Sequence, residues 1–426
     1  MLEIIKGILW AIVTVLIILS GIYFSKQLSF PQLKIKKIIK SLKDNNNKGL
    51  STIKTLFLTL AGRIGVGSIA GVALAIYIGG PGTIFWMWII AIISAPLAYT
   101  ETLLSIKYKD IKNNIGGPSH YIKKGLSKKK LAIIYSILVI ISYLIGFIPI
   151  QSNTIVKSID IINQTNHLLI GIILAIISFI IIKGGINKIA KVTDKLIPFM
   201  TILYISMALF VIFTHIEKFP LVIMDIIKQA FNLKPFLSGF IVTILIGVQR
   251  AIFSNESGIG LGGIAASASN SQNGSQSGYI QILGVYITTI LICTSTAFMI
   301  LIFDYQNITL NNPNGIELTS LAFNYHFGNI GNILLVLCIL LFSFTTILTG
   351  YYYCESSLKF LSKKINIKIL IIITPLSVLL GTTTSPTTIW QMIDILVAVL
   401  ALINIYAMIK LKKEITDYHN KKDVKR

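Results

Sequence analysis

The chain has 426 residues, of which 54% are hydrophobic and only 13% are charged, and its mean hydropathy is +0.79. Soluble domains carry about 25% charged residues, so this composition excludes a soluble protein and indicates an integral membrane protein. The net charge of +22 does not indicate a nucleic-acid binder, because the lysines stand in loops between apolar stretches. The three cysteines lack CxxC spacing and the five histidines form no HExxH motif, so neither a disulfide framework nor a metal site is expected.

Eleven stretches of the chain are apolar enough, and close enough to the about 20 residues that a bilayer requires, to predict transmembrane helices. The first lacks a basic start and a small-residue cleavage site, so it is expected to remain as a helix rather than to be a signal peptide. Two loops, 221–235 and 315–327, are expected to be partly helical and to lie across the outer mouth, as lids or as interfacial helices. The predicted spans are residues 7–25, 56–79, 82–105, 131–152, 168–183, 195–214, 236–256, 279–303, 331–354, 369–382 and 388–410.

The charges of the loops predict the topology. Loops that follow odd-numbered spans are rich in lysine, except after the seventh span, where the chain leaves through the Ser/Asn/Gly-rich stretch 267–278. The opposite loops, such as 152–167 and 381–388, are nearly neutral. Because lysine and arginine concentrate on the cytoplasmic side, we expect a multi-pass protein of the cell membrane with its N-terminus outside and its C-terminus in the cytoplasm.

Two of the predicted spans contain glycine-rich interruptions, at 62–71 and at 250–260. A helix breaks at membrane depth only where protein or a water-filled cavity receives the freed backbone groups, and two such breaks are typical of the binding site of a secondary transporter. Without the first span, each break opens a block of five helices, which predicts an inverted repeat. The expected units are an N-terminal helix with a basic cytoplasmic loop (1–55), a first repeat (56–215), an outer loop with the second repeat (216–410) and a basic cytoplasmic tail (411–426).

A broken helix offers two kinds of ligand. Its second half begins with free N–H groups that suit a carboxylate, and its first half ends with free carbonyls that suit a cation such as sodium. One break can therefore hold a small zwitterion beside its coupling ion. Gly65, Gly67 and Gly71 permit a close backbone approach, although the spacing of Gly67 and Gly71 also fits close packing of helices.

The second break brings polar residues to membrane depth. Phe253 offers an apolar wall, and Ser254 and Asn255 offer oxygen atoms for a cation or a substrate. Glu256 is either a functional carboxylate or a structural acceptor of hydrogen bonds. In the ninth span, the adjacent hydroxyls of residues 345 and 346 either complete a sodium shell or bond back to their own helix.

Further polar residues are candidates for the pathway and its gates. Gln151 and Asn153, at the end of the fourth span, either line the pathway or lie at the interface. The intramembrane arginines, Arg63 and Arg250, need acidic partners, and Glu101 and Asp394 are the candidates. Because Arg250 is expected in the outer half, a pair between Arg250 and Asp394 would form a thin outer gate.

Several motifs resemble those of the alanine or glycine:cation symporter family, also called the sodium:alanine symporter family. They run from the first break to near the end of the chain in family order. Where the family usually has Thr-Gly-Asn, this chain has Val66-Gly67-Ser68, which bears on substrate preference. The matching stretches are Gly62–Ala73, Gly79–Trp88, Gly116–Pro118 with Tyr121-Ile122 and Lys124–Leu126, Gln151–Asn153, Ile252–Gly258, and Thr346–Leu348 before Tyr351–Tyr353.

The resemblance implies an all-helical leucine-transporter-type fold, with ten core helices in a 5+5 inverted repeat plus one N-terminal helix. It implies symport of alanine, glycine or a similar small neutral amino acid with sodium, by alternating access, and neither an enzyme nor a cofactor beyond Na⁺. The residues assigned to the substrate are Val66, Gly67, Ala70, Phe147, Phe253, Ser254 and Thr346. Those assigned to sodium are Arg63, Val66, Asn255, Thr345 and Thr346. Those assigned to gates or polar support are Arg63, Gln151, Arg250, Glu256 and Asp394.

Three alternatives remain open at this point. The first is a proton-coupled transporter, or a symporter of another small solute, on the same fold. The second is a channel. The third is a membrane enzyme, which would need clustered His, Asp and Glu residues or a nucleophile with its base, and the sequence has neither pattern.

Overall fold

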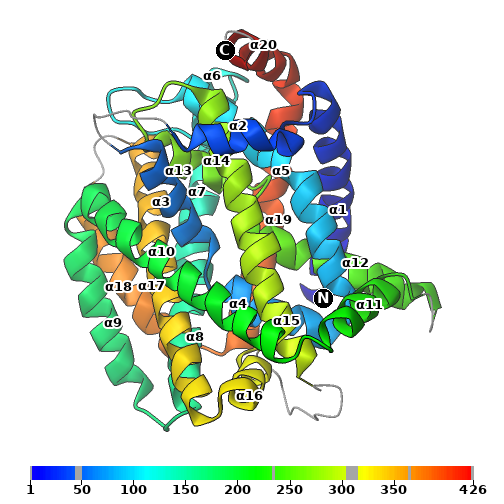
Figure 1. Cartoon of the computed structure of the whole chain (residues 1–426). Helices are drawn as coiled ribbons and strands as arrows, with labels where there is room; N and C mark the ends of the chain where they lie inside the picture. Colours follow the sequence, from blue (N-terminus) through cyan, green and yellow to red (C-terminus); the bar gives the residue numbers. More distant parts are fainter. Residues whose placement is uncertain (1, 44–49, 233–235, 304–314, 363–365, 424–426) are drawn as a thin grey trace.

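The computed structural model describes residues 2–43, 50–232, 236–303, 315–362 and 366–423, and every regular element within those ranges is helical (Figure 1). The β-type contact found there is an isolated bridge between Asp110 and Ile115. The all-helical prediction is therefore confirmed. Residues 233–235 of the predicted outer loop and 424–426 of the predicted tail lie outside the described ranges.

The elements up to the first outer loop are α1 (Leu2–Gln27), η1 (Pro31–Leu33), α2 (Ile35–Ser41), α3 (Thr52–Arg63), α4 (Val66–Gly79), α5 (Gly82–Tyr108), α6 (Pro118–Lys124), α7 (Lys129–Ile141), η2 (Ser142–Phe147), α8 (Ile148–Asp160), α9 (His167–Ile182) and α10 (Gly185–Thr214). The later elements are α11 (Phe219–Ala230), α12 (Phe236–Asn255), α13 (Leu261–Ser267), α14 (Gly274–Val285), η3 (Tyr286–Cys293), α15 (Thr294–Ile302), α16 (Ile316–Phe327), α17 (Asn329–Leu361), α18 (Lys368–Thr383), α19 (Pro386–Lys410) and α20 (Lys412–Asp423).

Seven helices within the described ranges are long and apolar enough to cross a membrane. The pair α3 and α4, bent by 42° at the first break, makes an eighth candidate, and α9, α18 and the Gly239–Asn255 part of α12 are shorter apolar helices. Each predicted span overlaps one of these helices, so their places in the chain agree. A count of eleven spans, and the inverted repeat built on it, remain predictions.

The helices are arranged between two ends that differ in their elements (Figure 1). At one end, uppermost in Figure 1 and called here the α20 end, lie α2, α6 and α20. At the other, called the α16 end, lie α11 and α16. Both of these helices fall in the loops expected to be partly helical.

Helix α5 is the most enclosed span of the molecule. Of its most apolar window 83% is buried, against 33% for α10, whose apolar side chains face outward as lipid-exposed residues do. It packs against α12 and α13 on one part of its surface and against α14 and α1 on others. Both halves of the second broken helix therefore rest on one central helix.

The first helix, α1, packs on α5 and α19 rather than standing apart from the bundle. The indole Nε1–H of Trp10 donates to the carbonyl of Asp394 at 3.0 Å, and Trp10 is buried. A buried donor of this kind needs an acceptor inside the protein. The predicted N-terminal helix, α1, therefore packs in a defined position against α19.

The topology can be tested by labelling single cysteines, because the native Cys293, Cys338 and Cys354 are all buried. Gln164 and Lys413 are exposed. Gln164 belongs to the segment between α8 and α9, and Lys413 to α20, and Figure 1 shows these two segments at opposite ends of the molecule. We expect a membrane-impermeant maleimide to label Gln164→Cys in intact cells, and to label Lys413→Cys only after the cells are permeabilised. The reverse pattern would contradict the predicted orientation, and the unsubstituted chain provides the background signal.

Candidate transport site

The first helix break lies between α3 and α4, where Ile64 and Gly65 leave the helical conformation. Gly65 adopts φ −137° and ψ −151°. A Cβ atom on Gly65 would lie 2.6 Å from Thr346 Oγ1 and 2.9 Å from Gln151 Oε1. Only glycine lets α17 and α8 approach the break this closely. The break therefore meets polar side chains from two other helices.

The side chain of Thr346 brings one hydroxyl into a group of backbone carbonyls. Its Oγ1 lies 2.9 Å from the carbonyl oxygen of Ala61, 3.4 Å from that of Ile64 and 3.0 Å from that of Phe342. A hydroxyl has a single proton to donate, so it cannot donate to all three oxygens at once. Several carbonyl oxygens beside a hydroxyl, at the end of a half-helix, form the ligand set that suits a sodium ion in transporters of this construction.

The neighbouring threonine is oriented differently. The hydroxyl of Thr345 donates to the carbonyl of Phe342 in its own helix at 2.9 Å. Thr349, one turn after Thr346, reaches the Leu58 carbonyl of α3 at 3.4 Å. Successive residues point about 100° apart on a helix of 3.6 residues per turn, so α17 presents Thr346 and Thr349 to α3 while the Thr345 hydroxyl stays with α17.

The first N–H group of α4 is capped by a side chain from α8. The N–H of Val66 donates to Gln151 Oε1 at 3.0 Å, and Gln151 is buried. The first N–H groups of a helix have no partner within the helix and carry a partial positive charge, so a carboxylate is well held there. An amide oxygen takes this position in the structure. Gln151 thus lies at the break itself and not at a membrane interface.

The second break is a loop between α12 and α13 with an unusual backbone. Glu256, Gly258 and Gly260 have φ angles of +55°, +82° and +101°. Glycine adopts this region without cost, but a residue with a side chain pays roughly 1–2 kcal/mol. The conformation of Glu256 must therefore be held by its surroundings.

Buried side chains from three surrounding elements bind this loop. They are Tyr143 in η2, Tyr135 in α7 and Asn404 in α19, all of them fully enclosed. The bonds run from Tyr143 Oη–H to Glu256 Oε1 at 2.9 Å, from Tyr135 Oη–H to the Ile259 carbonyl at 2.6 Å and from Asn404 Nδ2–H to the Gly258 carbonyl at 2.9 Å. Glu256 therefore acts as an acceptor that fixes the loop, while its Oε2 has no partner in the described part of the chain.

Asn255 is also bound within the second break. Its Oδ1 accepts the N–H of Ser257 at 3.0 Å, and its Nδ2 donates to Thr289 Oγ1 at 3.2 Å. Both of its polar atoms therefore have protein partners. As a sodium ligand, Asn255 would use a lone pair of the oxygen that already holds Ser257.

The structure brings the two breaks together. Ser68 Oγ at the start of α4 lies 2.9 Å from Ser254 Oγ at the end of α12. Ser254 Oγ is also 3.2 Å from Cys293 Sγ, and Thr296 donates from Oγ1 to the Ser68 carbonyl at 2.7 Å. All four residues are buried. Two segments almost 200 residues apart thus share a small polar junction next to η3 and α15.

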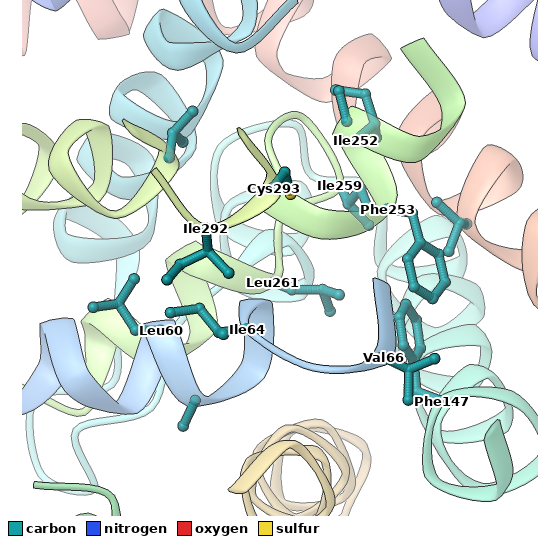
Figure 2. Close-up of a cluster of buried hydrophobic side chains, with 14 of the residues drawn as sticks. Leu60, Ile64, Val66, Phe147, Ile252, Phe253, Ile259, Leu261, Ile292 and Cys293 are labelled. Atoms are coloured by element: carbon teal, nitrogen blue, oxygen red, sulfur yellow. The ribbon is translucent and has the colours of Figure 1, made fainter. Parts of the chain in front are cut away.

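Three aromatic rings form a wall beside this junction. The ring of Phe253 stacks on Phe147 with centroids 5.2 Å apart and lies 5.0 Å from the ring of Trp390. Figure 2 shows Val66 next to the rings of Phe147 and Phe253. A Cβ on Gly67 would lie only 2.6 Å from Phe253 Cδ1. The wall therefore stands in contact with the first turn of α4.

The predicted pair of Arg250 and Asp394 is present. Arg250 Nη2 lies 2.8 and 3.0 Å from the two carboxylate oxygens of Asp394, and both residues are buried. The guanidinium carbon is 4.7 Å from the centre of the Trp390 ring and 5.8 Å from that of Phe253, which adds a cation–π attraction. The pair thus joins α12 to α19 directly beside the aromatic wall.

The direct pair expected between Arg63 and Glu101 is not formed. Arg63 Nη1 donates to the carbonyl of Gln281 at 3.1 Å, and Glu101 Oε2 accepts from Asn404 at 3.1 Å. Arg63 Nη2 and Glu101 Oε1 both lack a hydrogen-bond partner within the described ranges. The glycines of α13 allow the two groups to lie near each other without contact.

Most of the predicted site residues gather at the junction of the breaks. Ala70 lies one turn further along α4, where its carbonyl would be 2.2 Å from a Cβ on Gly315 at the start of α16. Asn153, considered with Gln151 as a pathway residue, instead donates to the carbonyls of Gly381 and Thr384 at 2.9 and 2.7 Å and ties α8 to α18. The assigned residues that lie at or beside the two breaks are Arg63, Val66, Gly67, Phe147, Gln151, Phe253, Ser254, Asn255, Glu256 and Thr346.

Sequence reasoning missed several residues at the junction. Ser68 was noted as a departure from the family motif but was not assigned to the site, although it stands in the first turn of α4 next to the first break. Tyr143 and Cys293 lie in the π-helical segments η2 and η3, which often occur at functional sites but have no mark in the sequence. The missed residues are Ser68, Tyr135, Tyr143, Cys293, Thr296, Trp390 and Asn404.

A family model described as the sodium:alanine symporter family matches residues 1–425. The chain belongs to the sodium:alanine symporter family. The predicted membership is therefore confirmed, and with it the predictions of transport, symport and the absence of an enzymatic role, since this is a family of transporters. The assignment of a secondary symporter rests on nearly the full length of the chain.

Relatives of this symporter are similar along most of their length. The amino-acid carrier protein AlsT of Bacillus subtilis is 35% identical over 405 residues, covering 93% of this chain and 86% of AlsT. The probable sodium/glutamine symporter GlnT of Bacillus subtilis is 35% identical and covers 96% of this chain and 87% of GlnT. The sodium/alanine symporter AgcS of Methanococcus maripaludis is 30% identical, covering 93% and 91%.

Solved structures share the symporter's fold at low identity. MhsT in complex with L-phenylalanine is 13% identical with a TM-score of 0.61, covering 86% of this chain and 90% of that one. A Na⁺-coupled sialic acid symporter is 12% identical with a TM-score of 0.52, covering 98% and 86%. These likenesses support the leucine-transporter-type architecture and are evidence of the fold alone.

The buried pair provides a test of the site's electrostatics. Asp394→Asn leaves the Arg250 cation buried without its counter-charge, so we expect it to lower the free energy of unfolding by about 3–5 kcal/mol. The double variant Arg250→Gln with Asp394→Asn removes both charges and should lose less than the single variant. Thermal unfolding in detergent measures both. Equal losses in the two variants would mean that the ion pair is not the source of the effect.

Proposed function

We propose that the chain is a sodium-coupled symporter of small neutral amino acids, with alanine or glycine as its substrate. The observation that carries this proposal is the arrangement at the first break. A helix N-terminus that can hold a carboxylate starts at Val66, and carbonyl oxygens that can hold a cation surround Thr346. Both sets of ligands lie at the junction of the two breaks, so an amino acid and its coupling ion would bind side by side.

In this proposal the substrate carboxylate replaces the side-chain oxygen of Gln151 at the N–H of Val66. The Gln151 amide can then turn and donate its own N–H to the carboxylate, so that it stays bonded. Ser68 and Ser254 offer hydroxyls across the junction. Where Thr and Asn are usual in the family, Val66 lacks the hydroxyl and Ser68 is the shorter side chain, so this end of the site is less polar and leaves more room.

The size of the substrate is limited by the aromatic wall. Phe253 stands in contact with Gly67 and is itself backed by Phe147 and Trp390. A small side chain fits such a place with least displacement of the rings. The names of the relatives, among them alanine and glutamine symporters, also support a neutral amino acid.

Transport would proceed by alternating access. Sodium would order the first break and so raise the affinity for the amino acid, and by linkage the amino acid would raise the affinity for sodium by the same factor. Arg250 and Asp394 would form the gate on the outer side, which in the predicted topology is the α16 end. The block that contains both broken helices would rock against the rest of the molecule around the site.

The coupling ion and the substrate can be established with purified protein in proteoliposomes. We expect an inward sodium gradient to drive uptake of radiolabelled alanine, and an equal potassium gradient not to do so. Unlabelled glycine and alanine should compete more strongly than glutamine or phenylalanine. Uptake driven by a pH gradient without sodium would instead favour the proton-coupled alternative, and currents that do not saturate with substrate would favour a channel.

The two threonines of α17 provide a matched pair of variants. Thr346→Val removes the hydroxyl next to the carbonyls of Ala61 and Ile64, so we expect the apparent sodium affinity to fall by about tenfold or more, the range for a lost bond to a charged group. Thr345→Val removes a hydroxyl bonded within its own helix and should change sodium affinity less. Sodium titrations of alanine uptake measure both. An unchanged sodium dependence in Thr346→Val would exclude this site.

A further inference from the structure

A second group of buried polar atoms lies apart from the junction, around Gly262 in α13. The group has members from three other helices, α3, α5 and α14. Relative to the point where a Cβ on Gly262 would stand, Arg63 Nη2 is at 2.5 Å, Gln281 Oε1 at 3.1 Å and Glu101 Oε1 at 3.3 Å. At most 2% of each of these three residues is exposed. Because Gly262 has no side chain, all three polar atoms lie close to its backbone and to one another.

All three atoms lack a hydrogen-bond partner within the part of the chain that the structure describes. Buried polar atoms without partners are rare, and each costs free energy comparable to a lost hydrogen bond. Here they belong to a guanidinium, an amide oxygen and a carboxylate oxygen, so the cost is high. Three such atoms gathered beside Gly262 indicate that a small polar molecule lies between them.

The charges of the three polar groups decide which small molecule fits between them. A cation is excluded by the guanidinium of Arg63, and an anion by the carboxylate of Glu101. A water molecule fits, because it can accept from Arg63 Nη2–H and donate one proton each to Gln281 Oε1 and Glu101 Oε1. Three bonds are the usual number for a buried structural water. We infer that this symporter binds one structural water at Gly262.

The water would complete a hydrogen-bonded path between the two broken helices. Arg63 is the last residue of α3, the first half of the first broken helix. On the other side of the water, Glu101 Oε2 accepts from Asn404 Nδ2 at 3.1 Å, and the same Nδ2 donates to the carbonyl of Gly258 in the second break at 2.9 Å. The hydroxyl of Tyr121 in α6 donates to Asn404 Oδ1. The path therefore runs from one break to the other through α5 and α19.

The position of this hydrogen-bonded path gives it a role in keeping the α20 side closed. This role rests on the proposed function. Helices α3 and α13 are the halves of the broken helices on the α20 side of the breaks, and the water, beside α13, joins α3 to α5 and α14. Opening of that side requires α3 to leave α5, and the bonds through the water oppose this movement. We call this group of bonds through the water the inner latch. The latch can open because water can hydrate each of the partners separately when the helices move apart.

The first test is an experimental structure of the full chain at a resolution that shows ordered water. A separate density peak within hydrogen-bonding distance of Arg63 Nη2, Gln281 Oε1 and Glu101 Oε1 is expected. In Gly262→Ala the added methyl group would lie 2.5–3.3 Å from the three atoms and leave no room for a water between them, so the peak should be lost. A direct bond between Arg63 and Glu101 without a peak, or a peak unchanged in Gly262→Ala, would overturn the inference.

The second test measures the latch. Hydrogen exchange of the α3 amides, followed by mass spectrometry, should be about tenfold faster in Gly262→Ala, since a bond to a charged group is lost. Gly239→Ala is the matched control, because its added Cβ meets nothing within 4 Å, and its exchange should not change. Gln281→Met removes one acceptor of the water, together with the Nε2–H bond from Gln281 to Thr59 Oγ1 of α3 at 2.9 Å, and should also raise the exchange. If the water peak is present but the α3 amides exchange no faster in the variants, the latch would be overturned.

Sodium-dependent binding of alanine to the unsubstituted protein separates this inference from the proposed function. A water peak with faster exchange in the variants, but no binding of alanine, would contradict the proposed substrate and leave the water site intact. Binding of alanine without the water peak would support the proposed substrate and contradict the water site.

Discussion

Within a bilayer, every backbone N–H and C=O group must find its partner inside the protein, and the two breaks are built around this constraint. Gln151 accepts the N–H of Val66, and Asn404 and Tyr135 donate to carbonyls of the second break. None of these three residues belongs to a broken helix. The region of the two breaks is therefore held in shape by the helices around it, and its shape depends on their positions as much as on the glycines that interrupt α3–α4 and α12–α13.

The sequence predicted those features that depend on local composition, and those that depend on how few charged residues lie within the spans. The breaks showed themselves as glycine-rich stretches inside apolar spans, and helices were found at each predicted place. Arg250 and Asp394 were matched because a buried arginine needs an acid and few acids lie within spans. The same logic failed for Arg63 and Glu101, where hydrogen bonds to Gln281 and Asn404 took the place of direct contact.

Features that depend on how helices rotate and meet were not predictable from local pattern. Thr345 and Thr346 are equivalent as sequence, and only the rotation of α17 decides which one faces α3. Tyr143, Trp390 and Asn404 reach the breaks from helices without any motif at those positions. The π-helical turns η2 and η3 also shift which residues face inward, and a helical period of 3.6 applied to the sequence does not contain that shift.

The contact between Gln151 and Val66 has a consequence for energetics. Since an amide oxygen already satisfies this N–H group, a carboxylate that binds as proposed would exchange one good bond for another and would not relieve an exposed dipole. Only the difference between the two bonds would contribute to affinity, as when a ligand displaces a well-ordered solvent molecule. The carrier would thereby be protected from holding its cargo too tightly, and discharge at the far side would meet a lower barrier because the glutamine would return as the solute departs.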